Sequence, residues 1–474
     1  MYRERLLLMQ QRLLRQGITF KSITSKAENG SVLSPIDSLL GSEGPKAIYG
    51  ILTQPYQDEW YLEDLTGVIK LNRLDEAKFH RSDRIYTEGC IVLVEGELEG
   101  NEFTVKQMGF TSHETRKQSL DAMNIVDVFG DDKRLEQMRE QEVAMSSEEV
   151  QDQMFIILSD IKLDKQGVLD KLKELFDGYE NVFESYEDGE CLCPPLFILI
   201  GSFTTKTLKS SASRTEIISA YNNLANVISS CPWLAQNAKF LLIPGPEDPI
   251  INNVLPQRPI PDQFTKDLRK KVKHITFASN PCRIRYFSEE IVLFREDLLK
   301  RMQRHTVPIP KEDDASNKHL IDTILEQGHL LPLPLAVRPI YWDLDHVLRL
   351  SPLPNVLVLA DHAEQYQFVD NDPMASSVLA ELGYDNKQDF IKHYDNGDFN
   401  NMEEISEDMI YTLNSIIINN DINCTPLELL RSVRGKLEKE LPDGTIAFNP
   451  GSFSCDYSFN VYYPAKRLID TCTV

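Results

Sequence analysis

The sequence is poor in basic residues for its size. Its 474 residues include 50 Lys and Arg against 73 Asp and Glu, which gives a formal net charge of −23 at pH 7. Proteins that bind nucleic acid on their own hold the phosphates with a positively charged surface. The charge balance therefore argues against a stand-alone DNA-binding protein unless basic residues gather in one patch, and it favours protein partners.

Closely spaced cysteines and long apolar runs are also scarce. Of the eight cysteines, only Cys191 and Cys193 lie close together, and the second pair that a structural zinc site requires is missing. We interpret the cysteines as reduced thiols of an intracellular protein. The opening apolar run is too short for a signal sequence and arginines interrupt it, so we predict no targeting and no membrane segment.

Three common catalytic motifs are absent as well. The sequence has no Gly-x-Ser-x-Gly nucleophile elbow, no Walker A loop and no glycine-rich dinucleotide turn. These absences exclude the serine hydrolases, nucleoside triphosphatases and dinucleotide-dependent enzymes that carry such motifs.

Residues 1–20 predict an amphipathic helix. Its apolar side chains are expected on one side and its arginines on the other. The apolar set is Leu6, Leu7, Met9, Leu13 and Leu14, and the basic set is Arg3, Arg5, Arg12 and Arg15.

Residues 35–112 contain five short strand patterns separated by turn sequences. The patterns cover residues 47–54, 60–63, 68–72, 90–97 and 102–108. A block of this size and pattern favours a small β-barrel of the OB type. Such barrels can stack single-stranded bases on aromatic rings, but few basic residues surround the aromatics here, so we interpret them as barrel filling. The candidates are Tyr49, Tyr56, Trp60 and Tyr61.

Residues 154–474 alternate apolar strands with amphipathic helices, after a polar, acidic connector at residues 113–153. Strand patterns fall at residues 154–160, 195–202, 239–243, 272–278, 290–294, 355–362 and 459–463, and helical patterns at 167–177, 214–229 and 295–304. This alternation predicts an α/β domain whose central sheets are covered by helices. An acidic, Asn-rich stretch at residues 370–443 is expected to be an insertion in this domain.

Polar residues end several of these strands, where α/β enzymes keep their chemistry. The domain resembles the calcineurin-like phosphoesterase fold, in which Asp, His and Asn at strand ends hold two metal ions. Here Lys162 stands two positions after Asp160 in place of a histidine, and Ser202 replaces the bridging aspartate. Glu247 and Asp248 follow a proline in a loop that lacks the family's Asn and His.

The remaining strand ends deviate in the same direction. Arg295 occupies the place of a histidine, and the one histidine after Asp361, His362, falls outside the position of a ligand. We therefore predict a vestigial pocket with no catalytic residue, no metal ligand and no cofactor. Its members are Asp160, Lys162, Ser202, Glu247, Asp248, Arg295, Asp361, His362 and Asn449.

Short motifs extend the resemblance to a particular family. They are FILIGSF at 197–203, LIPGPEDP at 242–249, ASNPCRI at 278–284, VLFREDL at 292–298, HLLPLPL at 329–335 leading to PIYW at 339–342, and NPGSF at 449–453. With an OB barrel in front of a degenerate phosphoesterase domain, they resemble the B subunits of eukaryotic replicative DNA polymerases, and among these the second subunit of DNA polymerase epsilon.

This resemblance implies a nuclear, non-catalytic scaffold in DNA replication. It would bind the cysteine-rich C-terminal region of the catalytic subunit of DNA polymerase epsilon. Through the complex it would meet the small histone-fold subunits and the replicative helicase, and it would contact DNA indirectly or weakly. Residues 1–20 would be the tail of a helical domain that precedes this region in the family.

Two alternatives stay open on the residues alone. One is an active metal-dependent phosphoesterase or nuclease, and the other is a single-stranded DNA-binding OB protein.

Overall fold

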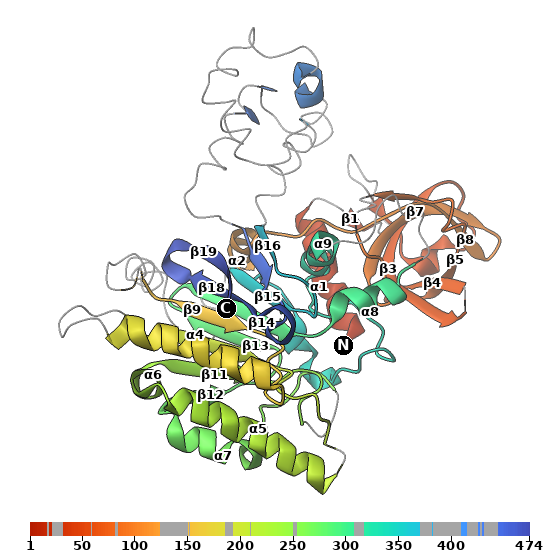
Figure 1. Ribbon diagram of the computed structural model, residues 1–474. Coiled ribbons are helices and arrows are strands. Elements are labelled where there is room, and N and C mark those ends of the chain that lie inside the picture. Colours follow the sequence, from red (N-terminus) through yellow and green to blue (C-terminus); the bar gives the residue numbers. More distant parts are fainter. Residues whose placement is uncertain are drawn as a thin grey trace.

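A β-barrel, a helix beside it and two stacked sheets with outer helices make up the computed structural model (Figure 1). The structure describes residues 1–16, 19–20, 32–57, 59–80, 84–123, 150, 152–184, 193–208, 210–249, 254–307, 317–369, 382, 409–414, 425–426, 429–430 and 444–474. The predicted insertion at 370–443 therefore lies largely outside the described residues.

Five strands close the barrel in the order β3-β4-β5-β8-β7, with β7 pairing back onto β3. Strands β5 and β8 run parallel, and the other neighbours in the ring are antiparallel. The ring confirms the predicted barrel. Its strands are β3 (Lys46–Tyr56), β4 (Glu59–Glu63), β5 (Val68–Asn72), β7 (Ile91–Glu99) and β8 (Glu102–Gly109). Smaller elements adjoin it: β1 (Thr19–Phe20), β2 (Val32–Leu33), η1 (Ile36–Leu39) and β6 (Lys78–His80).

The candidate aromatics of the barrel divide into two pairs. Trp60 belongs to the barrel core and Tyr49 packs beneath the first helix, with exposed fractions of 6% and 5%. Tyr56 is exposed and meets the edge of Tyr61, whose hydroxyl donates to the carboxylate of Glu59. Lys70 lies between Glu59 and Glu102, at 3.2 and 3.1 Å, so two acids engage the nearby cation and it is not free to hold a phosphate.

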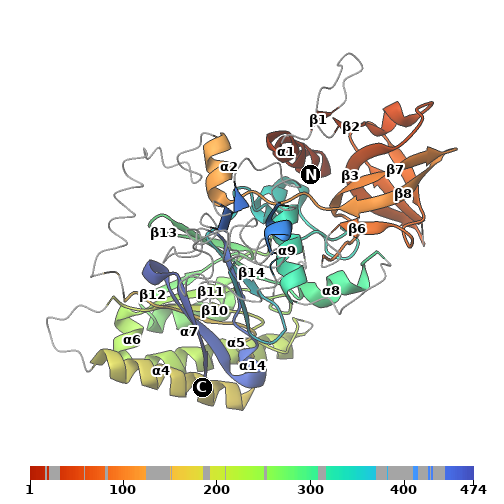
Figure 2. The same ribbon diagram turned by 90° about the horizontal axis from the view of Figure 1, so that it is seen from above.

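Helix α1 (Tyr2–Arg15) lies beside the barrel, and Figure 2 shows it close to α9 (Asn317–Gln327). Leu6, Met9 and Leu13 share one side of the helix, as predicted, and they are buried against barrel strands. The predicted division of the other side chains between the two faces is wrong in part. Leu7 and Leu14 are exposed, whereas Arg5 and Arg12 are buried, because distant polar groups of the second domain receive their guanidinium groups.

Two sheets stack against each other in the second domain. One has six strands in the order β12-β11-β10-β9-β18-β19, and the other has five in the order β13-β14-β15-β17-β16. The six are β9 (Phe155–Leu158), β10 (Leu196–Ile200), β11 (Lys239–Ile243), β12 (His274–Phe277), β18 (Ser458–Tyr463) and β19 (Leu468–Thr473). The five are β13 (Cys282–Tyr286), β14 (Glu289–Arg295), β15 (Val356–Ala360), β16 (Tyr366–Val369) and β17 (Ile446–Asn449).

The core of this domain is layered because side chains alternate along each buried strand. On β15, Val356 and Val358 point into the layer between the sheets, while Leu357 and Leu359 point to the outer layer. Both faces are covered, which explains why these strands appear in the sequence as continuous apolar runs.

Helices cover the outer faces of both sheets. Figure 1 shows the helices of the six-stranded sheet in yellow and green below it. These are α4 (Gln166–Glu184), α5 (Ser211–Ser229), α6 (Pro232–Asn237) and α7 (Asp262–Lys271). The outer core of the five-stranded sheet includes residues of α8 (Leu298–Arg304) and α9. The predicted helix at 295–304 is wrong at its start, since Arg295 ends strand β14 and α8 begins at Leu298.

The described part of the chain also contains four short helical elements. They are α2 (Arg116–Met123), η2 (Trp342–Leu348), α14 (Phe453–Asp456) and η3 (Pro464–Lys466). Within the described residues, the helices lack either the length or the apolar character that crossing a membrane requires.

Candidate functional site at the strand ends

The predicted pocket residues gather where parallel strands of the two sheets end. Strands β9, β10 and β11 run parallel in one sheet, and β14 and β15 run parallel in the other. Because parallel strands end at one edge, the loops that follow them meet there. The ammonium of Lys162, the guanidinium of Arg295 and the ring of His362 each lie within 4.0 Å of the Asp160 carboxylate. We call these four residues the strand-end cluster.

Arg295 joins the two sheets at this edge and is only 3% exposed. Its Nε donates to the carbonyl of Gly201 at 2.8 Å, and its Nη1 donates to the carbonyl of Ala360 at 3.1 Å. Nη1 also binds the carboxylate of Asp297 at 2.6 Å. Burial by itself would lower the pKa of Arg295, but the charges of Asp297 and Asp160 outweigh burial and raise it. The guanidinium is therefore charged and held from several sides.

Asp160 is 2% exposed and adopts a positive φ of 54° directly after strand β9. Its Oδ2 accepts hydrogen bonds from the hydroxyls of Ser452 and Ser454, at 2.7 and 3.1 Å. Burial opposes its ionisation, yet the charge of Arg295 and the hydrogen bond from Ser452 lower the pKa below its usual value. The carboxylate is thus ionised, and the chain supplies its counter-charges.

Asp248 connects the loops that follow β10 and β11. Its two carboxylate oxygens each accept a backbone N–H at 2.7 Å, from Phe203 and from Gly245. Burial raises the pKa of Asp248 to about 7. A Cβ added at Gly201 would lie 2.0 Å from Asp248 Oδ2, so this packing requires glycine. Asp248 therefore serves loop geometry here.

Ser202 and Glu247 contribute little to an ion site. The hydroxyl of Ser202 is buried and accepts a long hydrogen bond of 3.4 Å from the backbone N–H of Glu247. The Glu247 side chain itself is exposed.

Asp361 and Asn449 also have structural partners. Asp361 Oδ2 accepts the backbone N–H of Leu299 at 2.9 Å and so stabilises the first turn of α8. The amide of Asn449 donates to three successive loop carbonyls at 3.2 to 3.3 Å, those of Asp361, Ala363 and Glu364. The two residues thus fix the loop after β15.

One group of side chains has the spacing of metal ligands. Atoms of Asp160, His362 and Cys455 lie within 4.8 Å of one another, and in the described part of the chain no other three His, Cys, Asp or Glu side chains do so. Cys455 lies on the short helix α14, far along the chain, and no sequence pattern pointed to it. Arg295 and Lys162 approach the same carboxylate at 3.7 and 3.5 Å, and their positive charges oppose a divalent cation. The residues therefore do not fit a two-metal centre.

Comparison with known proteins first defines the class. Residues 155–369 match the family model that describes the B subunits of DNA polymerases alpha and epsilon. Residues 1–112 match the model for the OB-fold domain of DNA polymerase epsilon subunit 2-like proteins. Both the barrel and most of the two-sheet domain thus match subunits of replicative polymerases.

Curated relatives then identify the branch. The chain is 37% identical over 373 residues to the B subunit of DNA polymerase epsilon from Arabidopsis thaliana, which covers 77% of this chain and 68% of the relative. It is 35% identical over 373 residues to DNA polymerase epsilon subunit 2 of Homo sapiens, with the same coverage. The chain therefore belongs to the family of DNA polymerase epsilon B subunits, and the resemblance predicted from its motifs is confirmed.

Proposed function

We propose that this chain is a non-catalytic accessory subunit of DNA polymerase epsilon that acts in the nucleus during DNA replication. One observation carries the proposal: the guanidinium of Arg295 lies beside Asp160 where a phosphoesterase would need a metal ion. The guanidinium of Arg295 holds the strand ends of the two sheets together, but it does not provide the open coordination positions that hydrolysis requires. We further propose that the two-sheet domain is an inactive phosphoesterase-like body.

As its partner we propose the cysteine-rich C-terminal region of the catalytic subunit of DNA polymerase epsilon. The small histone-fold subunits and the replicative helicase would be reached through the complex, and DNA only indirectly. The net charge of −23 supports protein contacts over direct DNA contacts.

Helix η2 offers a candidate contact for that partner. Trp342 is 71% exposed, and Tyr341 and Leu344 beside it are 40% and 41% exposed. Exposed tryptophan and tyrosine are enriched among the residues that dominate binding energy in protein interfaces. We propose that these three side chains take part in the subunit interface.

Co-expression with the tagged C-terminal region of the catalytic subunit tests the proposal. We expect the two chains to co-purify, and Trp342→Ala to weaken binding about tenfold or more, the usual effect of truncating a hot-spot residue. Leu40→Ala is the matched control, because Leu40 is 77% exposed on the barrel side of the molecule. Failure of the unaltered chain to co-purify would contradict the proposed function.

A second candidate function, metal-dependent phosphodiester hydrolysis, rests on the group formed by Asp160, His362 and Cys455. We expect no hydrolysis of a phosphodiester by the purified chain with Mn²⁺ or Zn²⁺. Hydrolysis that disappears in the double variant Asp160→Ala and Asp248→Ala would establish the enzyme instead.

A further inference from the structure

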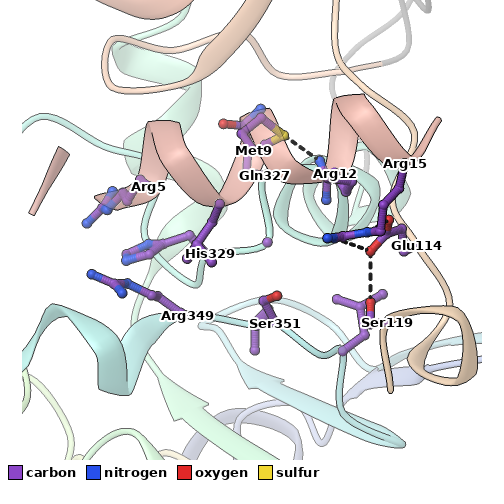
Figure 3. Close-up of a pocket in the computed structure, with 14 residues that line it drawn as sticks. Arg5, Met9, Arg12, Arg15, Glu114, Ser119, Gln327, His329, Arg349 and Ser351 are labelled. Atoms are coloured by element: carbon purple, nitrogen blue, oxygen red, sulfur yellow. Dashed lines mark hydrogen bonds and ion pairs between the residues drawn. The ribbon is translucent and has the colours of Figure 1, made fainter. Parts of the chain in front are cut away.

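A small cavity lies between α1, the segment that follows the barrel and the second domain. It has a volume of about 50 Å³, and four arginines line it: Arg5, Arg12, Arg15 and Arg349. Figure 3 shows the first three on α1, on the side of the helix that faces His329, Ser351 and Ser119. We call this cavity the α1 pocket.

Three of the four arginines are neutralised by carboxylates. Arg15 binds both oxygens of Glu114, at 2.7 and 2.8 Å. Arg5 and Arg349 share the buried carboxylate of Asp345, at 3.1 Å from Arg5 Nε and 2.9 Å from Arg349 Nη2. Arg349 also binds Glu4.

Arg12 differs from these three because none of its partners is a carboxylate. Its Nη2 shares two hydrogens among three acceptors, which are the hydroxyl of Thr111 at 2.7 Å, the sulfur of Met9 at 2.9 Å and the backbone carbonyl of Glu326. The side chain is only 9% exposed, and its Nε is buried without a hydrogen-bond partner. The Glu326 carboxylate is engaged by Arg84 at 3.0 Å.

The environment makes the charge of Arg12 unfavourable. Burial lowers its pKa to about 10, in spite of the attraction of Glu114 and Glu326. At neutral pH the guanidinium is still charged, so a buried cation faces the α1 pocket without a direct counter-ion among the described residues. Buried charges in proteins are normally paired.

We propose that the α1 pocket binds a small oxyanion, a phosphate or carboxylate group, as the counter-ion of Arg12. The volume suits such a group, since it equals the space of roughly three or four water molecules. Guanidinium forks match the geometry of both phosphate and carboxylate. The hydroxyl-bearing side chain of Ser351 is exposed and lines the pocket, which gives a ligand a polar edge to enter by.

Binding at this place would have a structural consequence. Through Arg12, helix α1 already contacts Thr111, which follows the barrel, and Glu326 on α9. An anion bound to Arg12 strengthens a junction that joins the helix to both domains.

The experiment measures the thermal midpoint and calorimetric binding of the purified full chain at constant ionic strength. The probes are inorganic phosphate and acetate, with chloride as the reference anion. We expect saturable one-to-one binding of phosphate, of acetate or of both, and a rise of the midpoint of about 1 to 4 °C at ~100-fold excess over Kd. The two arms distinguish the phosphate source from the carboxylate source.

Two variants assign the binding to this pocket. Ser351→Glu places a carboxylate at the edge of the pocket and should raise the midpoint without added anion and abolish the anion response. Ser351→Gln, its neutral match, should keep the response, as should Arg73→Gln at an exposed barrel arginine. Absence of saturable binding in the unaltered chain, or an undiminished response in Ser351→Glu, would overturn the proposal.

Discussion

Two buried arginines in this chain differ in how their positive charge is compensated. Arg295 at the strand ends is held by Asp297, by two backbone carbonyls and by the nearby charge of Asp160, and its pKa is raised. Arg12 in the α1 pocket has a hydroxyl, a sulfur and one carbonyl as partners, and burial lowers its pKa. The first network is complete within the chain, and the second lacks a negative charge.

The difference shows what a closed network does to a site. At the strand ends the chain supplies both signs of charge, so the geometry of the loops is fixed without a ligand. At the α1 pocket the unbalanced charge leaves room for a ligand to add stability. Substitutions at the two places test this difference.

The largest effect is expected for Arg295→Met. Removal of the guanidinium leaves the buried carboxylate of Asp160 without its main counter-charge, which typically costs about 3–5 kcal/mol. Urea unfolding of the two-sheet domain measures the loss. Arg73→Met, at an exposed surface pair, should change stability by less than about 1 kcal/mol. Equal effects of the two substitutions would contradict the structural role of Arg295.

The next effect concerns how α1 is held. Leu13 is fully buried against the barrel, and Leu14 beside it is 48% exposed. Leu13→Ala should lower stability by about 3 kcal/mol through the cavity that it creates, and Leu14→Ala by less than about 0.5 kcal/mol. Thermal unfolding of both variants checks this. Similar losses would mean that the helix does not pack in this orientation.

A pH dependence is expected from His329, which lines the α1 pocket. Burial, together with the charge of Arg5, lowers its pKa from 6.5 to about 4, although Asp345 opposes that shift. As the pH falls from about 6.5 to 4, the imidazole of His329 therefore binds a proton in the unfolded chain but stays neutral in the folded chain. Because of this difference, the free energy of unfolding should fall by about 2 kcal/mol between pH 6.5 and 4.

The variant His329→Asn isolates this contribution. Its amide oxygen can still accept the backbone N–H of Leu331, which His329 Nδ1 accepts at 3.0 Å. Urea unfolding at several pH values should show a shallower decline between pH 6.5 and 4 in the variant. An unchanged slope would assign the dependence to other groups.

The smallest effect is expected at Cys455. The thiol is exposed, and the cations beside Asp160 oppose a metal ion there. Cys455→Ser should alter stability by less than about 0.5 kcal/mol. Zn²⁺ should raise the thermal midpoint no more in the unaltered chain than in the variant, and a Zn²⁺ response specific to Cys455 would break the contrast between the two arginines.

Strands with both faces buried were the most predictable part of the fold. The patterns at 239–243 and 355–362 match β11 and β15 closely, because continuous apolar runs indicate strands covered on both sides. Strands β13 and β19 were not predicted. They lie at sheet edges and are only partly buried, so polar residues interrupt their patterns.

The sequence indicated some of the residues at the strand ends but none of their contacts. Lys162 and Arg295 were recognised as departures from a ligand pattern and Asp160 as a retained residue, and the structure brings the three together. The partners Ser452, Ser454 and Asp297 were missed, since serines and an acid near a helix start carry no distinctive signal in a sequence.

The positions of the buried strands and the strand ends without metal ligands can be predicted from the residues, because apolar periodicity and residue identity are local properties. The folded chain alone shows that Arg5 reaches Asp345, 340 positions away, and that Arg295 meets Gly201 across the two sheets. The same holds for the buried charge of Arg12, because the pairing of charges depends on distances that folding alone creates.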